Sequence, residues 1–231
     1  ILIANRGEIA VKIINMCKSM NISTVAIYSE ADKDSLHVKL ADESYCIGSV
    51  LPKDSYLNMH AIISIAMAAG AQAIHPGYGF LSEIYEFALL CEENDIIFIG
   101  PSSSTIKKMG DKFSAKLLMQ EMNVPVIKGA YVGNDVVKIK EEARKIGYPV
   151  MIKLRNGGGG RGIRAVNKEE DLEKLVVESI NDGKNYFNSE KIYVEKYVSP
   201  ASHIEVQIIA DKHGNVLCLG ERDCSIQIRN Q

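Results

Sequence analysis

Hydrophobic and polar positions along the first hundred residues follow two alternating patterns. Short runs of apolar and β-branched residues predict strands at 2–4, 24–28, 73–75 and 96–99. Between the first two runs, one helical face is formed by Ile9, Ile13, Ile14 and Cys17. Further helices are predicted at 56–69 and 84–93. Strands that alternate with helices are typical of βαβ units, so this part is expected to form a parallel sheet.

Beyond residue 110 the order of predicted elements changes. A helix opens at Asp111, runs to about residue 121 and is ended by Asn123-Val124-Pro125, so it is interpreted as a connector. The next elements are predicted in the order helix 135–146, strand 150–153, glycine-rich loop, strand 163–166, helix 168–180 and strand 192–196. Residues 203–211 alternate strictly between apolar and polar side chains, which predicts a strand that returns as a hairpin through 216–219.

Composition and charge narrow the possible partners. At roughly 100 to 200 residues per domain, 231 residues are expected to form one large or two small domains. A formal net charge of −2 creates no overall field that attracts nucleic acid or an anionic membrane, so any phosphate binding must be local. The most apolar stretch, 61–74, is shorter than the roughly 20 residues that cross a bilayer. The five cysteines form no C-x-x-C pair, which favours a reducing cytoplasm.

The strongest local motif is the glycine run of residues 157–162. Gly157, Gly159 and Gly162 match the G-x-G-x-x-G spacing, but a predicted strand follows instead of the helix that a dinucleotide fingerprint requires. Glycines between two strands indicate a flap whose backbone N–H groups close over phosphates, with a plain hairpin loop as the alternative. Lys153 enters this loop and Lys112 opens a helix, so each can meet phosphate oxygens or remain a solvated surface lysine.

Three further segments lie at strand ends. Residues 192–198 form a strand whose exposed backbone can pair with an adenine edge, although an ordinary connecting strand has the same pattern. Residues 75–83 follow a predicted strand and are interpreted as a structural turn, with His75 as a hydrogen-bonded structural histidine. The turn Asn5-Arg6-Gly7-Glu8 holds one glycine, which argues against NAD binding.

Taken together, these motifs resemble the biotin carboxylase family from one end of the chain to the other. The segments that carry the resemblance are Ile3-Ala4-Asn5-Arg6-Gly7-Glu8-Ile9-Ala10, His75-Pro76-Gly77-Tyr78-Gly79-Phe80-Leu81-Ser82-Glu83, Phe98-Ile99-Gly100-Pro101, Met109-Gly110-Asp111-Lys112, Glu195-Lys196-Tyr197, His203-Ile204-Glu205-Val206-Gln207 and Glu221-Arg222-Asp223-Cys224-Ser225.

The resemblance implies an α/β fold in which a Rossmann-like N-terminal domain precedes an incomplete α+β ATP-grasp domain. Its implied divisions are the N-terminal domain at 1–110, a connecting helix at 111–125, a lid subdomain with the glycine flap at 126–199, and the start of a truncated C-terminal subdomain at 200–231.

The resemblance also implies the chemistry: ATP phosphorylates bicarbonate to carboxyphosphate, which carboxylates biotin on a carrier protein. Homodimerisation of the full-length parent is implied as well. The residues carried over to the ATP site are Lys112 and Lys153 at the phosphates, Gly159 and Gly160 in the flap, Glu195, Lys196, Tyr197 and Val198 at the adenine hinge, and His203, Gln227 and Asn230 to complete it. Catalytic residues and the Mg²⁺ ligands are expected beyond Gln231, so the chain alone is expected to be inactive.

Two departures from the family pattern leave alternatives open. The family usually has small residues where Leu154 and Arg155 stand, and it has an arginine and a histidine at the positions of Ile228 and Asn230. These changes motivate a second hypothesis, a non-catalytic remnant that binds a nucleotide or a partner. A third, another ATP-grasp ligase, does not fit the Asn-Arg-Gly-Glu segment. The pattern leaves open whether the parent is an acetyl-CoA carboxylase subunit or a larger enzyme such as pyruvate carboxylase.

Overall fold

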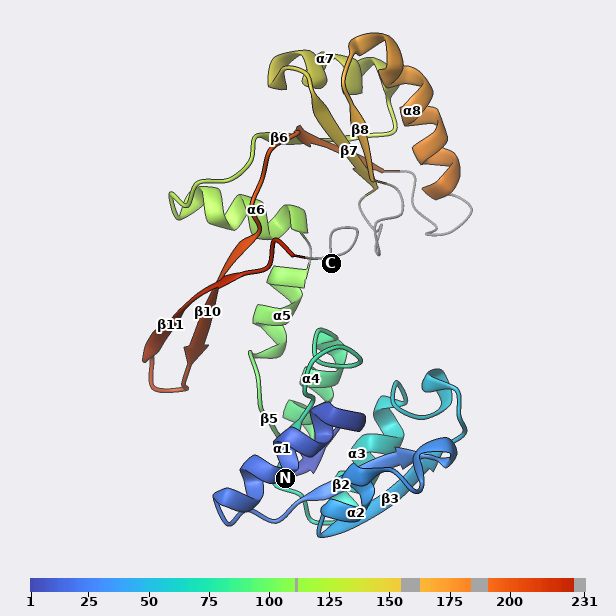
Figure 1. Cartoon of the computed structure of the whole chain (residues 1–231), viewed down its shortest axis with the longest axis vertical. Helices are drawn as coiled ribbons and strands as arrows, with labels where there is room; N and C mark the ends of the chain where they lie inside the picture. Colours follow the sequence, from blue (N-terminus) through green and yellow to red (C-terminus); the bar gives the residue numbers. More distant parts are fainter. Residues whose placement is uncertain (111, 155–162, 184–190, 227–231) are drawn as a thin grey trace. The chain divides into compact units, whose positions relative to one another are not determined.

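The structure is a computed structural model that describes residues 1–231 except 111, 155–162, 184–190 and 227–231; the side chains of 112 and 113 are likewise outside the description. The chain forms two compact units, Ile1–Leu118 and Met119–Gln231 (Figure 1). Within the described residues, no helix is long and apolar enough to cross a membrane.

Unit 1 is built on a five-stranded sheet in the order β3-β2-β1-β4-β5, and every neighbouring pair is parallel. The strands are β1 (Leu2–Ile3), β2 (Val25–Ser29), β3 (Glu43–Gly48), β4 (Ala73–His75) and β5 (Ile97–Phe98). The helices are α1 (Gly7–Ser19), α2 (Leu36–Leu40), α3 (Met59–Ala68), α4 (Tyr85–Glu93), α5 (Ser103–Gly110) and α6 (Lys112–Glu121), with short 3-10 helices at Glu30–Asp32 and Pro52–Asp54. The predicted parallel α/β architecture is confirmed.

Both faces of this sheet are covered because successive strand side chains point in opposite directions. Leu2 packs with Ile62 of α3 and Phe87 of α4 on one face. Ile3 packs with Ala10 and Ile14 of α1 on the other. The apolar run at the start of the chain therefore contributes to two separate cores.

Two elements of unit 1, α2 and β3, are absent from the predicted set. β3 is an edge strand in which only Ile47 is buried, so its sequence lacks the apolar alternation that marks a half-buried strand. Its pairing with β2, in which Val25 lies opposite Glu43, determines its conformation.

A buried carboxylate connects the first turn of unit 1 to the end of β2. Asp32 accepts hydrogen bonds from Arg6 Nε at 2.7 Å and from the Tyr56 hydroxyl at 2.6 Å, and Arg6 Nη2 contacts its second oxygen. The Ser29 hydroxyl lies 3.3 Å from the same carboxylate. The hydrogen bonds from Arg6 hold the pKa of Asp32 well below its usual range, while burial raises the pKa of Tyr56 to about 12.

We expect Asp32→Asn to lower the unfolding free energy of unit 1 by about 2 kcal/mol near neutral pH, because an amide cannot satisfy a bidentate arginine. A depressed carboxyl pKa contributes stability that is fully present above the unfolded value of about 3.9 and is lost as pH falls below it. Urea denaturation from pH 7 to pH 3 should show the difference between wild type and variant shrinking below about pH 4. Asp34→Asn, at an exposed position two residues away, is the control, and an equal loss in both variants would contradict the assignment.

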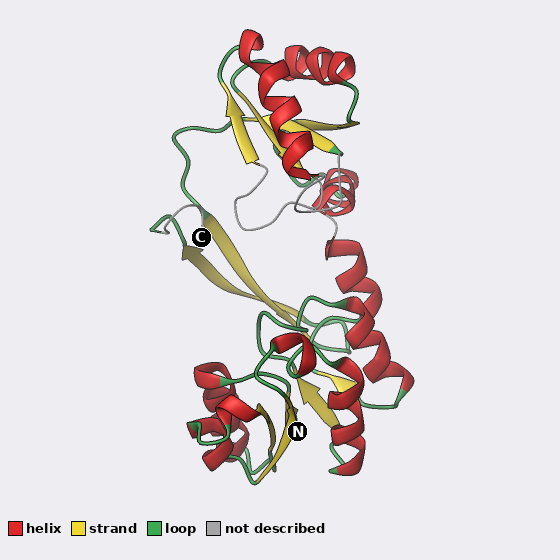
Figure 2. Ribbon diagram, turned by 90° about the vertical axis from the view of Figure 1, so that its right-hand side faces the viewer, coloured by secondary structure: helices red, strands yellow, loops and turns green. Residues whose placement is uncertain are grey.

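Unit 2 contains a four-stranded antiparallel sheet in the order β6-β9-β7-β8. Its strands are β6 (Gly129–Gly133), β7 (Val150–Leu154), β8 (Ile163–Val166) and β9 (Ile192–Lys196), with helices α7 (Val136–Ile146) and α8 (Glu169–Asp182). A separate hairpin pairs β10 (Ile204–Ala210) with β11 (Val216–Asp223) (Figure 2). The predicted strands and hairpin are confirmed; β6, a short edge strand with a glycine at each end, was not predicted.

The two faces of this sheet differ in character because burial alternates along β7. Val150, Ile152 and Leu154 are buried with Ile139 of α7 and Leu172 of α8 in one core. Both helices therefore pack on this face, which we call the core face. The opposite face, the open face, carries Met151, Lys153, Tyr193 and Glu195 by the register of β7 and β9.

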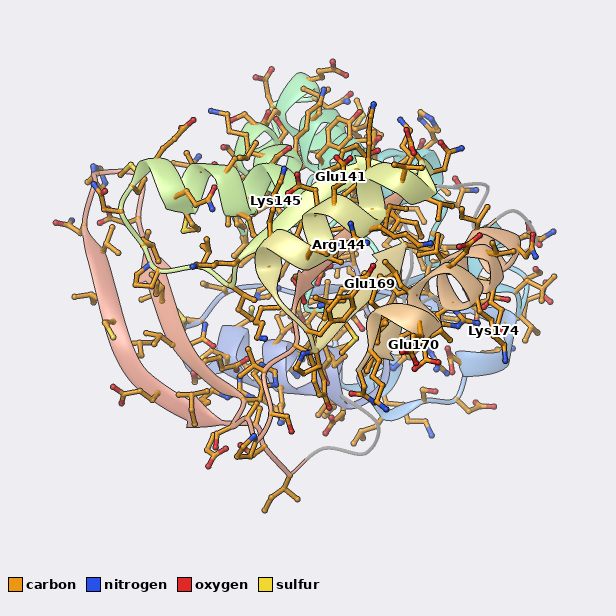
Figure 3. The ribbon with its side chains drawn as sticks, turned by 90° about the horizontal axis from the view of Figure 1, so that it is seen from above. Glu141, Arg144, Lys145, Glu169, Glu170 and Lys174 are labelled. Atoms are coloured by element: carbon orange, nitrogen blue, oxygen red, sulfur yellow. The ribbon has the colours of Figure 1, made fainter. Side chains whose placement is uncertain are left out.

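Ion pairs on the outer surface of α7 and α8 connect the two helices (Figure 3). Arg144 contacts Glu169, with its Nε 2.9 Å from Oε1, and Lys140 lies 2.7 Å from Glu173. Such exposed pairs are typically worth less than about 1 kcal/mol. The buried aliphatic side chains, rather than these charges, hold the helices on the sheet.

The side chain of Lys196 stabilises the end of α7. Lys196 ends β9 opposite Val150, on the core face. Its ammonium donates to the carbonyls of Gly147, at 2.9 Å, and Tyr148, at 3.1 Å. These two carbonyls directly follow the last residue of α7, so the ammonium lies at the C-terminal end of the helix, where a cation interacts favourably with the helix dipole.

Replacing Lys196 with Met is expected to lower the unfolding free energy of unit 2 by about 1 kcal/mol, since two carbonyls lose their donor. Amide hydrogen exchange in the last turn of α7 should become faster by a corresponding factor. Lys174→Met, at an exposed position on α8 (Figure 3), is the matched control. Unaltered exchange in Lys196→Met would show that the contact contributes nothing.

Candidate functional site

The open face of the unit 2 sheet holds a partly buried ion pair. Lys153 of β7 lies opposite Tyr193, and Met151 lies opposite Glu195 of β9, so Lys153 and Glu195 are diagonal neighbours. The Lys153 ammonium contacts Oε1 of Glu195. The Lys153 side chain is 35% exposed and that of Glu195 is 7% exposed. The face therefore presents the Lys153 cation with a buried counter-ion beside it.

A glycine shapes the same face from β6. Gly129 lies opposite Glu195, and a Cβ built on Gly129 would come within 2.2 Å of the Tyr193 hydroxyl and 2.8 Å of the Val194 carbonyl oxygen. The phenol of Tyr193 thus occupies the space of the missing side chain. Neither Gly129 nor Tyr193 was a predicted site residue, because the strand register that brings them together is not visible in the sequence.

Just beyond β9, paired backbone N–H groups give way to unpaired ones within the described residues. Lys196 donates its N–H to Lys128 O at 2.8 Å, and Tyr197 donates to Pro149 O at 3.2 Å. The next N–H, that of Val198, has no partner in the part of the chain that the structure describes. The Val198 side chain is 49% exposed. A free N–H at an exposed strand end can pair with an acceptor on the edge of a planar base, as predicted for this hinge.

The hinge residues differ in which of their groups can reach a ligand. The Lys196 side chain is directed to the core face, where it holds the end of α7. Only its backbone can therefore contribute to a site on the open face. Glu195, by contrast, presents its carboxylate on that face beside Lys153.

His203 lies at the base of the hairpin. Its N–H donates to Ser225 Oγ at 3.0 Å, and its carbonyl accepts from Cys224 N at 2.7 Å. These contacts close the two strands, and the residue is exposed. Its assignment to the nucleotide site remains a prediction.

Several predicted site residues are outside the description. They are the side chain of Lys112 and the whole of Gly159, Gly160, Gln227 and Asn230. The substituted positions Arg155 and Ile228 belong to the same segments. Leu154 is described: it is 4% exposed and packs in the core of unit 2. Its bulk is thus accommodated away from the open face.

In unit 1, side chains of the first turn lie at the edge of the sheet where dinucleotide folds bind their ligand. The strand order reverses between β1 and β4, where open α/β sheets have a crevice. Here Asn5 Nδ2 donates to Pro76 O at 2.8 Å and Tyr78 O at 3.0 Å. A Cβ on Gly77, whose φ is +65°, would lie 2.7 Å from Ile9 and 2.8 Å from Asn5 Nδ2. This packing stabilises the turn, and the absence of NAD binding at the first turn stays a prediction.

His75 at the same edge is a structural residue, as predicted. Its Nδ1 accepts the Gly77 N–H at 3.0 Å, and burial lowers the pKa of its imidazole. A neutral ring that accepts this bond stabilises the turn. Across the described ranges of the chain, no group of three or more His, Cys, Asp or Glu side chains could hold a metal ion, so we derive no metal-dependent step from them.

Two family models match the chain in succession. The model described as biotin carboxylase, N-terminal domain, matches residues 1–106. The model described as carbamoyl-phosphate synthase L chain, ATP binding domain, matches residues 111–231. The order of the two matches follows the order of the parallel and antiparallel sheets.

Curated relatives and solved structures agree with these models. The mitochondrial methylcrotonoyl-CoA carboxylase subunit alpha of Dictyostelium discoideum is 54% identical over 100% of this chain and 33% of its own length. A crystal structure of a biotin carboxylase–β-γ-ATP complex from Campylobacter jejuni is 48% identical with a TM-score of 0.93, over 100% of this chain and 52% of that one.

The biotin carboxylase domain dimer of 2-oxoglutarate carboxylase from Hydrogenobacter thermophilus, in complex with MgADP, ADP and bicarbonate, is 50% identical with a TM-score of 0.91, over 100% of this chain and 51% of that one. The chain thus spans from a third to about half of the length of the relatives it matches. By its two family models and by the architecture of both units, the chain belongs to the biotin carboxylase family.

Proposed function

We propose that the protein containing this chain is an ATP-dependent biotin carboxylase, in which ATP and bicarbonate form carboxyphosphate and the carboxyl group passes to biotin on a carrier protein. The observation that carries the proposal is the Lys153 ammonium on the open face of the sheet, on the strand next to the hinge with its free Val198 N–H. A backbone donor can pair with the base, and a lysine can act as a point charge for phosphate oxygens.

The ligands named in this proposal are supported by the ligands bound in similar solved structures. The Campylobacter jejuni biotin carboxylase structure is an ATP complex, and the Hydrogenobacter thermophilus domain holds MgADP, ADP and bicarbonate as a dimer. We extend these ligands and homodimerisation to the full-length protein. Mg²⁺, when bound, would neutralise charge that develops during phosphoryl transfer. Localisation in the cytoplasm belongs to the proposal and is supported by the odd number of cysteines without C-x-x-C pairs.

The acyl acceptor is left unassigned in this proposal. Similar relatives are named for methylcrotonoyl-CoA and for 2-oxoglutarate, so an acetyl-CoA carboxylase in fatty acid synthesis is one of several possible parents. Residues 1–231 alone are proposed to turn over little, because the family resemblance implies that the Mg²⁺ ligands and the catalytic residues lie beyond Gln231.

The activity is tested on full-length protein by bicarbonate-dependent ATP hydrolysis in the presence of free biotin. A biotin carboxylase should release ADP only when bicarbonate and biotin are both present. Nucleotide binding without any such turnover would favour the second candidate, a non-catalytic member of the family, for which the substitutions at Ile228 and Asn230 are the motivation. The buried position of Leu154 removes one argument for that candidate.

Lys153→Met should weaken ATP binding at least tenfold, which corresponds to about 1.4 kcal/mol, because the uncharged side chain cannot attract phosphate oxygens. Isothermal titration with ATP measures the change. Lys145→Met is the matched control, because Lys145 is an exposed lysine of α7 (Figure 3). The Lys145 ammonium lies 2.6 Å from Glu142. The ATP affinity of this variant should equal that of the wild-type protein. Equal affinities in all three proteins would remove Lys153 from the site.

A further inference from the structure

The open face carries an anion as well as a cation, because the Lys153 ammonium contacts the carboxylate of Glu195. This carboxylate is almost fully buried from solvent. Glu195 is 5% exposed, and it stands on β9, which has β6 on one side and β7 on the other. Gly129 and Met151, the residues directly opposite Glu195, carry no charge. Lys153, one diagonal step away, contacts the carboxylate with its ammonium.

The difference in exposure indicates which partner orients the other. A lysine side chain has four rotatable bonds, and fixing it costs up to about 2 kcal/mol of rotamer entropy. A glutamate on a central strand, enclosed by its neighbours, has little of that freedom. The carboxylate is therefore the fixed partner, and the longer lysine side chain is ordered against it.

The contact orders the ammonium without using all of its hydrogen-bonding capacity. An ammonium group has three N–H donors, and one contact with Oε1 leaves two for a ligand. Because the lysine is ordered before the ligand arrives, less entropy is lost on binding.

We propose that Glu195 is a positioning residue that holds the Lys153 ammonium where it meets the phosphate groups of a bound nucleotide. This role rests on the proposed function, and it differs from a contact between Glu195 and the base. A positioning residue that acts through Lys153 affects only the part of the affinity that the phosphates contribute. Adenosine, which has no phosphates, therefore serves as the internal reference.

The measured quantity is the ratio of the adenosine Kd to the ATP Kd, determined by isothermal titration of the full-length protein. Glu195→Gln keeps the shape of the side chain and removes its charge, so the ratio should fall about five- to tenfold because the ATP Kd rises more than the adenosine Kd. Glu205→Gln is the matched control, since it removes a carboxylate that lies 3.1 Å from Arg222 in the hairpin; its ratio should equal that of wild type.

A second comparison shows whether the effect passes through the lysine. In a Lys153→Met background, Glu195→Gln should produce no further change in the ratio, because the group that it positions is gone. If Glu195→Gln does not fold, Glu195→Asp is measured instead, since the shorter carboxylate withdraws from Lys153 and should lower the ratio in the same way.

The outcomes separate this role from the proposed function. A ratio that is unchanged or higher in Glu195→Gln, with ATP still bound by wild type, would overturn the positioning role alone. Equal losses for adenosine and ATP would place Glu195 against the base and also overturn it. A wild-type protein that binds neither ligand would overturn the nucleotide site and the positioning role together.

Discussion

The two-residue repeat of β7 and β9 is the constraint on which the rest of unit 2 depends. One set of side chains, including Ile152 and Val194, is buried against α7 and α8. The other set, including Lys153 and Glu195, faces the opposite side. A shift of one residue in the pairing would exchange the two sets, placing charges in the core and aliphatic groups on the open face. Packing the core therefore also fixes where the charged pair lies.

This constraint explains why neighbouring hinge residues have different roles. Glu195 and Lys196 are adjacent in sequence, yet one side chain joins the ion pair of the open face and the other holds the end of α7. It also accounts for Leu154, whose larger side chain lies on the core face and is buried there. Position relative to the sheet, rather than residue type, separates the groups that can meet a ligand from those that support the fold.

Unit 1 shows how side chains of the first turn stabilise the carboxyl edge of a dinucleotide-type sheet. Its strand order produces a crevice between β1 and β4, but Asn5 hydrogen-bonds across that position to the loop after β4. Arg6, the next residue, is engaged with the buried carboxylate of Asp32. The polar residues of this turn thus stabilise the carboxyl edge of the sheet.

The sequence by itself determined the family, the order of the parallel and antiparallel parts, and most strands and helices, because these depend on local periodicity and on motifs read along the chain. It did not reveal β3 and β6, since edge strands with few buried residues take their conformation from the neighbouring strand. The ion pair of Lys153 with Glu195, the close approach of Tyr193 to Gly129, and the use of Lys196 as a helix cap were decided by tertiary structure alone. Each of them joins residues more than 40 positions apart, or depends on a strand register that packing selects.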